Sequence, residues 1–426
     1  MELKKYKLGE ILDVTRGASL SGEFYAAEGE YVRLTCGNFD YQNNCFKENK
    51  AKDNLYYIGD FKPDFLMKEG DIITPLTEQA IGLLGSTAII PESGKYIQSQ
   101  DVAKIVCKEH LLDKDFAFYL ISSNLVKQQL SAAAQQTKIR HTSPDKIKDC
   151  IVWIPELEEQ KRIGKLLRTI DLKIELNRQL NHNLEAMAKQ LYDYWFVQFD
   201  FPNEEGKPYK SSGGEMVWNE KLKRNMPKEW CAMTIGEVEN NIITGKTPSC
   251  ADEDNFGGDI PFITIDDIRG NLFVFNSQRT LSTKGAESQT KKYLPSGSLS
   301  VSCIGTIGVM GFIAKLSQTN QQINSIVFEN EHNREFVYFA LKLYFENAKA
   351  KTGNVFANMS KDEFASIKVV YSPKQILQEF HNKVVAIFDN IKNNIDEINA
   401  LTKQRDELLP LLMNGQAMVN SDLSDG

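Results

Sequence analysis

The chain has 426 residues, of which 42% are hydrophobic and 25% charged, and its formal net charge is −7. At roughly 100–200 residues per domain, this length predicts two or three domains, and the composition excludes collagen-like, mucin-like and wholly disordered chains. No apolar run reaches the roughly 18 residues of a membrane span, and the N-terminus lacks the apolar core of a signal peptide. We therefore expect a soluble, cytoplasmic protein without membrane contacts.

Charge and cysteine usage limit the chemistry further. Lys and Arg are spread along the chain without a basic tail, so any contact with DNA is expected to use limited loops and a more basic partner. The 7 cysteines form no C-x-x-C pair, and the 5 histidines are not arranged as metal ligands. This pattern predicts neither a disulfide framework nor a metal site.

The sequence repeats at about half of its length. Leu8-Gly9-Glu10-Ile11 returns as Ile235-Gly236-Glu237-Val238, and Tyr31-Val32-Arg33-Leu34 returns as Phe262-Ile263-Thr264-Ile265. Between such marks lie short segments rich in Val, Ile, Tyr, Phe and Thr, separated by Gly, Pro, Asn and Asp, which is typical of β-strands and turns. We therefore expect two similar β-rich domains.

After Pro155 and Pro373, which end the last strand of each half, the apolar period changes from 2 to about 3.5. Each half then carries an unbroken 4-3-4-3 stripe of about 33 residues, roughly 50 Å of helix. The second stripe is Phe380, Val384, Ile387, Ile391, Asn394, Ile398, Leu401, Arg405, Leu408 and Leu412, and the first is Ile163, Leu167, Ile170, Ile174, Asn177, Asn181, Leu184, Ala188, Leu191 and Trp195.

Such narrow stripes favour a coiled coil between the two helices. A whole domain connects them, and in an antiparallel pair the two globular halves would lie at opposite ends. Asn177 and Asn394 interrupt both stripes at the same place, where a polar residue can fix the register. The alternative is that each helix packs only on its own globular half. The predicted fold is α+β, with two similar β-rich α/β domains separated by two long antiparallel helices that form a coiled coil.

The expected boundaries follow from these patterns and from a Pro-, Gly- and Ser-rich connector between the halves. The segments are a first domain (1–156), a first long helix (157–199), the connector (200–229), a second domain (230–374), a second long helix (375–414) and a C-terminal tail (415–426).

Motifs for catalysis are missing from the sequence. It contains no G-x-x-x-x-G-K-[ST] loop, no G-x-S-x-G elbow and no methyltransferase tetrapeptide of the N-P-P-Y type. Asp266 and Asp267 resemble a metal pair, but a solvated turn explains them better. We therefore expect a chain that is not an enzyme and has no catalytic residues.

Several motifs together resemble the DNA-specificity subunit of type I restriction-modification systems, over essentially the whole chain. They are Thr244-Gly245-Lys246-Thr247-Pro248-Ser249, Leu184-Glu185-Ala186-Met187-Ala188-Lys189-Gln190-Leu191-Tyr192 leading to Trp195-Phe196, Gly213-Gly214-Glu215-Met216-Val217, and Arg405-Asp406-Glu407-Leu408-Leu409-Pro410-Leu411-Leu412-Met413-Asn414-Gly415. The first half departs from the family pattern, with Thr15-Arg16-Gly17-Ala18-Ser19 where the second has the fuller glycine-threonine-proline turn.

The resemblance implies that both domains are target-recognition domains for double-stranded DNA. It implies a bipartite, gapped target whose adenine is methylated at N6 by two methyltransferase subunits, and cleavage by two motor-nuclease restriction subunits. S-adenosylmethionine, ATP and Mg would then belong to these partners, and this chain would hold no cofactor. Open alternatives are a stand-alone DNA-binding regulator or decoy, and an enzyme that modifies nucleic acid.

Candidate DNA contacts are basic, hydroxyl or amide side chains, most of them in polar stretches or at turns and strand ends. For each of them, an exposed solubilising residue is the alternative, and His141 taken alone is better explained as a structural histidine. The candidates are Arg16, Arg33, Thr137, Lys138, Arg140, His141, Lys146, Lys246, Thr247, Arg269, Arg279, Lys284, Lys291, Lys292, Lys351 and Asn354.

A cluster of aromatic residues ends the first long helix. Trp195, Phe196, Phe199 and Phe201 are expected either in the core or at an interface with the methyltransferase subunit.

Overall fold

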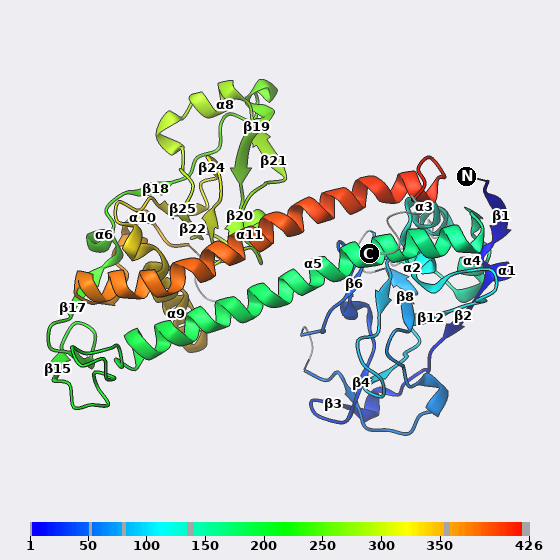
Figure 1. The fold of residues 1–426 in the computed structure, drawn as a ribbon, viewed down its shortest axis with the longest axis horizontal. Coiled ribbons are helices and arrows are strands. Elements are labelled where there is room, and N and C mark those ends of the chain that lie inside the picture. The colour runs from blue at the N-terminus through cyan, green and yellow to red at the C-terminus, as the bar shows by residue number, and fades with distance from the viewer. Residues whose placement is uncertain (1, 51–52, 79–81, 134–139, 353–357, 420–426) are drawn as a thin grey trace. The chain divides into compact units, whose positions relative to one another are not determined.

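The computed structural model describes residues 2–50, 53–78, 82–133, 140–352 and 358–419 (Figure 1). The chain divides into a first unit, residues 1–174 and 400–426, and a second unit, residues 175–399. Each unit contains one end of both long helices, α5 (Leu157–Tyr192) and α11 (Lys374–Met413). In the described part of the chain, no helix is both long enough and apolar enough to cross a membrane.

The first unit is built on a four-stranded sheet of order β10-β8-β12-β2 and another of order β11-β4-β7-β3. In the former, Ile105 of β12 lies opposite Val14 of β2 on one side and Ile72 of β8 on the other. Their β-branched side chains favour such pleated, buried segments. The strands are β2 (Leu12–Arg16), β3 (Tyr25–Ala26), β4 (Tyr31–Arg33), β7 (Tyr56–Tyr57), β8 (Ile72–Pro75), β10 (Ala88–Ile89), β11 (Tyr96–Ile97) and β12 (Val102–Cys107).

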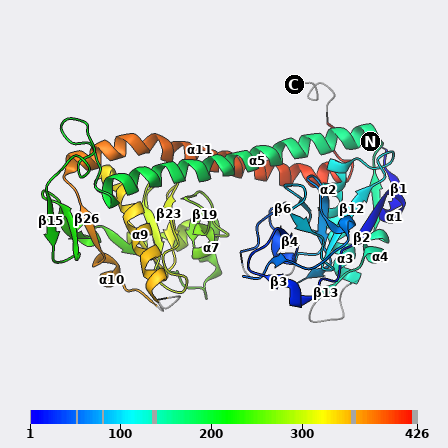
Figure 2. The same ribbon diagram turned by 90° about the horizontal axis from the view of Figure 1, so that it is seen from below.

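The second unit has a five-stranded sheet of order β18-β25-β22-β23-β20 and a three-stranded sheet of order β21-β19-β24. In Figure 2, most strands of each unit, taken by itself, lie on one side of the helix segments that belong to that unit. The strands are β18 (Ile242–Thr244), β19 (Phe256–Ile263), β20 (Phe273–Val274), β21 (Arg279–Leu281), β22 (Leu299–Ser302), β23 (Met310–Ile313), β24 (Gln318–Thr319) and β25 (Ile323–Ile326).

The two units share a local structure at the start of their globular parts. β1 (Lys4–Lys7) pairs with β14 (Ile151–Ile154), and β17 (Cys231–Thr234) pairs with β26 (Lys368–Tyr371), in each case antiparallel. The short helices α1 (Leu8–Ile11) and α6 (Ile235–Val238) follow, and a glutamate in each accepts a hydrogen bond of 2.7 Å from the amide before the helix. The predicted α+β fold with two similar domains is confirmed.

Two glycines explain the repeated Thr-Gly turn. A Cβ atom on Gly17 would lie 2.2 Å from the carbonyl oxygen of Gln98, and one on Gly245 would lie 2.2 Å from that of Asn320. Both distances are far below van der Waals contact, so only glycine lets the turn approach the neighbouring segment this closely.

The helices α5 and α11 pack against each other in antiparallel orientation within both units. In the first unit, Arg405 Nη1 donates to Asp171 Oδ1 at 2.8 Å. In the second unit, Asn177 Nδ2 donates to Glu397 Oε2, and Asn394 Nδ2 donates to Asn181 Oδ1, both at 2.8 Å. In an antiparallel pair, a constant sum of the two residue numbers means a constant register. The sum is 575 within one residue for all three pairs, so the same register holds in both units. The predicted coiled-coil pairing is confirmed.

The helices also bury part of their stripes on the globular part of each unit. Ile163 and Leu167 of α5 belong to the core of the first unit together with Phe116 of α2 (Lys114–Ser122). Phe380 and Val384 of α11 belong to the core of the second unit, which also contains much of α9 (Arg334–Thr352). The helices therefore pack on the globular halves and also form the coiled coil.

Candidate nucleic-acid interface

Some expected DNA contacts cannot be placed at the level of side chains. Thr137, Lys138 and Asn354 lie outside the described residues. For Arg140, in β13 (Arg140–His141), and for Lys351, in α9, only the backbone is described.

The two arginines of the first unit differ in exposure. Arg16, at the end of β2, is exposed and its Nε donates to the carbonyl oxygen of Gln100 at 2.9 Å. Arg33 is only 8% exposed; its Nη2 donates to the carbonyl oxygen of Asn54 at 3.3 Å, and its guanidinium lies 3.8 Å from the centre of the Tyr25 ring. The Arg33 side chain thus stabilises the local loop and offers little surface to a duplex.

The short strand β13 pairs with β9 (Thr77–Glu78), which places Arg140 opposite Glu78 and His141 opposite Thr77. His141 is exposed, and its Nδ1 lies 3.3 Å from Thr77 Oγ1. Lys146 is also exposed and lies in α4 (Pro144–Lys148), which begins at a Ser143 cap. The polar stretch around these residues therefore contributes to two neighbouring elements at the surface.

In the second unit, the turn at residues 244–247 contacts the segment at 289–292. Lys292 Nζ donates to the carbonyl oxygen of Thr244 at 2.8 Å, and Gln289 Nε2 donates to that of Lys246 at 2.7 Å. Thr247 Oγ1 donates to Gln321 at 2.6 Å. The structure therefore brings Lys246, Thr247 and Lys292 together, with exposed Lys291 in the same short helix as Lys292.

Two other cations of the second unit already face carboxylates. Arg269 Nε lies 3.7 Å from Asp266, and Lys284 Nζ lies 2.8 Å from Asp252 and 3.4 Å from Asp254. The hydrogen bond with Asp252 raises the pKa of Lys284 above its ordinary value. A DNA phosphate would have to compete with these carboxylates.

Arg279 has a different environment. It is exposed in β21, and its guanidinium lies 4.4 Å from the centre of the Phe256 ring and 6.0 Å from that of Phe262. These distances are those of cation–π contacts, which orient a guanidinium without neutralising its charge.

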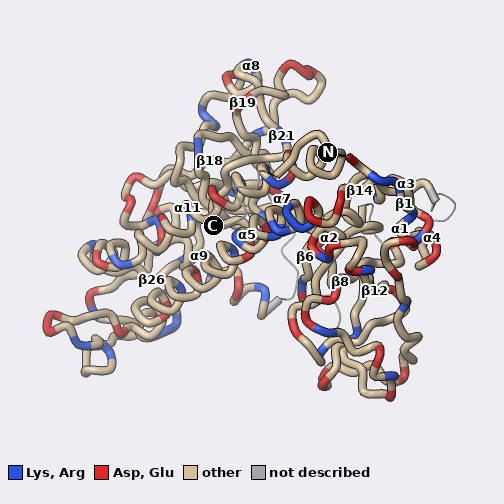
Figure 3. The backbone as a smooth tube through the Cα atoms, turned by 45° about the vertical axis from the view of Figure 1, so that its right-hand side comes forward, with Lys and Arg blue, Asp and Glu red and all other residues tan. Residues whose placement is uncertain are grey.

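Charges of both signs alternate along the tube in both units, as Figure 3 shows. In the described residues, we therefore consider the candidates for DNA contact one side chain at a time.

The seam asparagines both donate hydrogen bonds from one long helix to the other. Asn177 is buried at 5% exposure against Glu397, and Asn394 is half-buried against Asn181. Their role in fixing the register stays a prediction.

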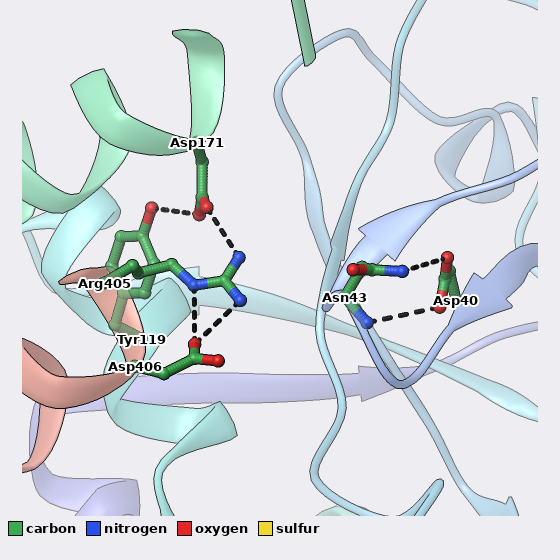
Figure 4. A network of polar contacts seen from close by, with 6 residues as sticks. All are labelled: Asp40, Asn43, Tyr119, Asp171, Arg405 and Asp406. Carbon is green, nitrogen blue, oxygen red and sulfur yellow. Dashed lines mark hydrogen bonds and ion pairs between the residues drawn. The ribbon is translucent and has the colours of Figure 1, made fainter. Parts of the chain in front are cut away.

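A polar network that we did not anticipate surrounds Asp171 in the first unit (Figure 4). The Tyr119 hydroxyl donates to Asp171 at 2.6 Å and Arg405 donates at 2.8 Å, while Asp406 accepts from the other side of the guanidinium. The one signal in the sequence was the arginine at a seam position where an apolar residue was expected.

The aromatic cluster at the end of α5 lies in the core of the second unit. Trp195, Phe196, Phe199 and Phe201 are 2–4% exposed, and Phe201 stacks on Trp230 with ring centres 5.0 Å apart. Core packing accounts for all four side chains, so they present almost no surface to a partner within this unit. A partner contact there would need other side chains.

Exposed apolar side chains lie instead on the helix itself. Leu176, Leu180 and Met187 of α5 are 55%, 43% and 56% exposed. Their spacing of four and seven residues places them on one face of the helix, outside the seam. The sequence contained this signal as apolar residues that fall between the seam positions.

The second unit also contains a cavity of about 330 Å³, lined in part by Glu185, Tyr338 and Lys342. Burial opposes ionisation of Glu185, but hydrogen bonds from Lys342 and Tyr338 outweigh it and lower the pKa of this carboxyl. Glu185 is thus held by structural partners. Among the described residues, no group of three His, Cys, Asp or Glu side chains could hold a metal ion.

The family model described as "Type I restriction modification DNA specificity domain" matches residues 1–186 and again residues 227–406. The chain belongs to this family. It is 29% identical to the specificity subunit of the type I restriction enzyme HindI from Haemophilus influenzae, over 97% of this chain and 99% of that subunit. It is 22% identical to the MjaIX specificity subunit from Methanocaldococcus jannaschii, over 75% and 73% of the two chains.

A solved structure supports the fold. The crystal structure of a type I restriction-modification S subunit from M. genitalium matches with a TM-score of 0.60, covering 97% of this chain and 96% of the other at 17% identity. At this identity the similarity concerns the fold alone.

Proposed function

We propose that this chain is the DNA-specificity subunit of a type I restriction-modification complex and acts in recognition rather than catalysis. The observation that carries the proposal is the double match to the DNA specificity domain, once on each side of the connector. The match agrees with two units of similar local structure joined by the pair α5 and α11.

The target in this proposal is bipartite, with an unread gap between two half-sites. Equivalent places in the two units carry different side chains: Arg16 and Ala18 flank Gly17, whereas Thr244 and Lys246 flank Gly245. Because base edges are read by specific donors and acceptors, two different sets of side chains should select two different half-sites.

The chemistry belongs to partners in this proposal. Two methyltransferase subunits would transfer a methyl group from S-adenosylmethionine to adenine N6, and two motor-nuclease subunits would use ATP and Mg for cleavage. This chain would bring them to one sequence and would itself hold no cofactor.

The exposed apolar face of α5 is the surface that we assign to a partner subunit in place of the buried aromatic cluster. Exposed apolar side chains in a row mark interaction sites more often than isolated ones do. Replacing Leu176 and Leu180 by Glu should prevent co-purification with the methyltransferase subunit, whereas Gln179→Glu, an exposed neighbour, should not. Equal co-purification of both variants would contradict this assignment.

The central test uses the chain together with its methyltransferase subunits and long-read detection of methylated adenines. One gapped sequence should be methylated; exchanging residues 1–156 for those of a relative should change one half-site, and exchanging 230–374 should change the other. Methylation that is insensitive to both exchanges, or one exchange that alters both half-sites, would contradict the proposal. Tight specific binding by the isolated chain would favour a regulator, and turnover by the isolated chain would favour an enzyme.

The helix pair should also set the length of the gap. Inserting a matched heptad into α5 and α11 adds about 10 Å of helix, which corresponds to about three base pairs. An unchanged gap would remove the spacer role while leaving the two recognition roles intact.

A further inference from the structure

The cations of the second unit differ in what their charged groups already contact. Lys284 and Arg269 face carboxylates, and Lys292 donates to a backbone carbonyl. Arg279 is exposed, and in the described part of this unit no carboxylate pairs with its guanidinium. Its hydrogen-bonding edge is therefore available to a ligand.

The position of the Arg279 guanidinium is fixed by aromatic rings. Arg279 lies directly opposite Phe262 in the pairing of β21 with β19, and its guanidinium lies over the Phe256 ring at 4.4 Å. Phe256 and Phe262 are themselves packed edge to face, with ring centres 6.3 Å apart. A guanidinium stacked in this way keeps its planar fork of donors in one orientation, which a lysine ammonium cannot do.

The first unit also has an arginine over an aromatic ring, but there the arginine is buried. In the first unit, Tyr57 of β7 pairs with Tyr25 and Tyr31, and in the second unit Leu281 of β21 pairs with Phe256 and Ile260. The repeat that aligns Tyr31 with Phe262 also aligns Tyr25 with Phe256. Arg33 lies 3.8 Å from the Tyr25 ring, yet it is 8% exposed, whereas Arg279 over the corresponding ring faces solvent.

We propose that Arg279 reads a guanine in the half-site bound by the second unit, an inference that rests on the proposed function. Guanine presents two acceptors, O6 and N7, on its major-groove edge, and the guanidinium fork matches them with two parallel hydrogen bonds. Adenine offers N7 beside an amino donor, which would leave one donor of the fork unsatisfied. Arg33, which is buried over the corresponding ring of Tyr25, stabilises the first unit and reads no base.

The test uses the complex of this chain with its methyltransferase subunits. After the wild-type target has been defined, each base pair of the second half-site is replaced in turn, and kcat/KM for methylation is measured with the wild type, Arg279→Lys and Arg279→Ala. Lys315→Ala, which changes another exposed cation of the same unit, held by the side chain of Asn276, is the matched control. Hydrogen exchange of the amides of α9, which belongs to the second unit, reports whether each variant is folded.

Both Arg279 variants should lose discrimination at a single G·C pair by about 10-fold or more, with the other positions unchanged. Lys315→Ala should keep the wild-type profile. A loss that is uniform over all positions would make Arg279 a phosphate contact and overturn the proposal, as would an unchanged profile. A wild-type complex without a gapped target would instead contradict the proposed function, so the two failures are distinguishable.

Discussion

In the first unit, Tyr119 and Arg405 both contact Asp171, whereas the second unit has only apolar residues at the corresponding places. The repeat aligns Asp171 with Phe388, Arg405 with Ala188 and Tyr119 with Phe339. In the first unit, Tyr119 and Arg405 donate hydrogen bonds of 2.6 and 2.8 Å to Asp171. In the second unit, the rings of Phe339 and Phe388 lie 5.9 Å apart, and both residues are buried together with Ala188.

This difference separates two ways of joining a helix pair to a globular unit. Burial of aromatic rings stabilises the second unit through the hydrophobic effect, without demanding a particular orientation of donors. A mostly buried ion pair gains little net stability over apolar packing, because desolvation offsets the attraction, but it is costly to break. The polar network of the first unit therefore specifies how the helix pair is oriented on the globular part. The ring cluster of the second unit mainly stabilises the packing of the helix pair on its globular part.

The largest effect is expected on the apolar side. Phe388→Ala removes a fully buried ring that contacts Phe273, Phe312, Tyr338 and Phe339, and should lower the free energy of unfolding of the second unit by about 3–5 kcal/mol. Urea unfolding, monitored by hydrogen exchange of the α9 amides, measures this change in the free energy of unfolding. Phe388→Leu should cost less, and a loss of protection in α2 as large as that in α9 would contradict the assignment to one unit.

Breaking the polar network comes next. Asp171→Ala leaves Arg405 and the Tyr119 hydroxyl without their shared partner, and should lower the free energy of unfolding of the first unit by about 3 kcal/mol. The matched control is Asp406→Ala, because the Asp406 side chain is 59% exposed and its loss should cost under about 1 kcal/mol. Equal losses for the two variants, measured by hydrogen exchange of α2 amides, would show that burial of the ion pair is unimportant.

Replacing the polar network of the first unit by the apolar residues of the second should change the free energy of unfolding less. The triple variant Tyr119→Phe, Asp171→Phe and Arg405→Ala copies the apolar side and should unfold within about 1.5 kcal/mol of the wild type. The same urea titration should therefore rank it well above Asp171→Ala. A triple variant as unstable as the single one would mean that the first unit cannot accommodate apolar packing here.

The smallest effect concerns pH. Burial, reinforced by the Asp171 carboxylate, raises the pKa of the Tyr119 hydroxyl above its ordinary value of 10.0. A raised pKa in the folded state contributes stability that is complete below pH 10 and is lost as the pH rises above it. Between about pH 9 and 11, the first unit of the wild type should thus lose more stability than Tyr119→Phe. The exposed Tyr194→Phe serves as the control and should follow the wild type.

The sequence predicted the features that depend on local periodicity. The helix pair could be derived from the 4-3 spacing, because the spacing itself places Ile163 and Phe380 on a buried face, and the repeat implied two similar units. Pairings between distant segments could not be derived: nothing local to Arg140 indicates that β13 pairs with Thr77 and Glu78. For the same reason the burial of Arg33 was missed, since it depends on Tyr25 and Asn54.

Aromatic residues show a related limit. The cluster from Trp195 to Phe201 is equally apolar whether it faces a core or a partner. Its burial depends on rings elsewhere in the chain, among them Trp230, Phe336 and Phe380. The candidate DNA contacts remain predictions for the same reason. Exposure and charge could be anticipated, but the ring beneath Arg279 and the carboxylates beside Lys284 depend on tertiary structure.

The division of the chain has a consequence for its biosynthesis. Leu412 and Met413 at the end of α11 belong to the core of the first unit, and the amide of Val419 donates to Glu159 near the start of α5. Because the ribosome releases a chain from its N-terminus, the first unit lacks part of its interior until the residues that follow 399 have been synthesised. The second unit, which needs nothing after residue 399, can be complete earlier. The second unit can then fold before the first, and removing the residues that follow 399 should damage the unit that is synthesised first.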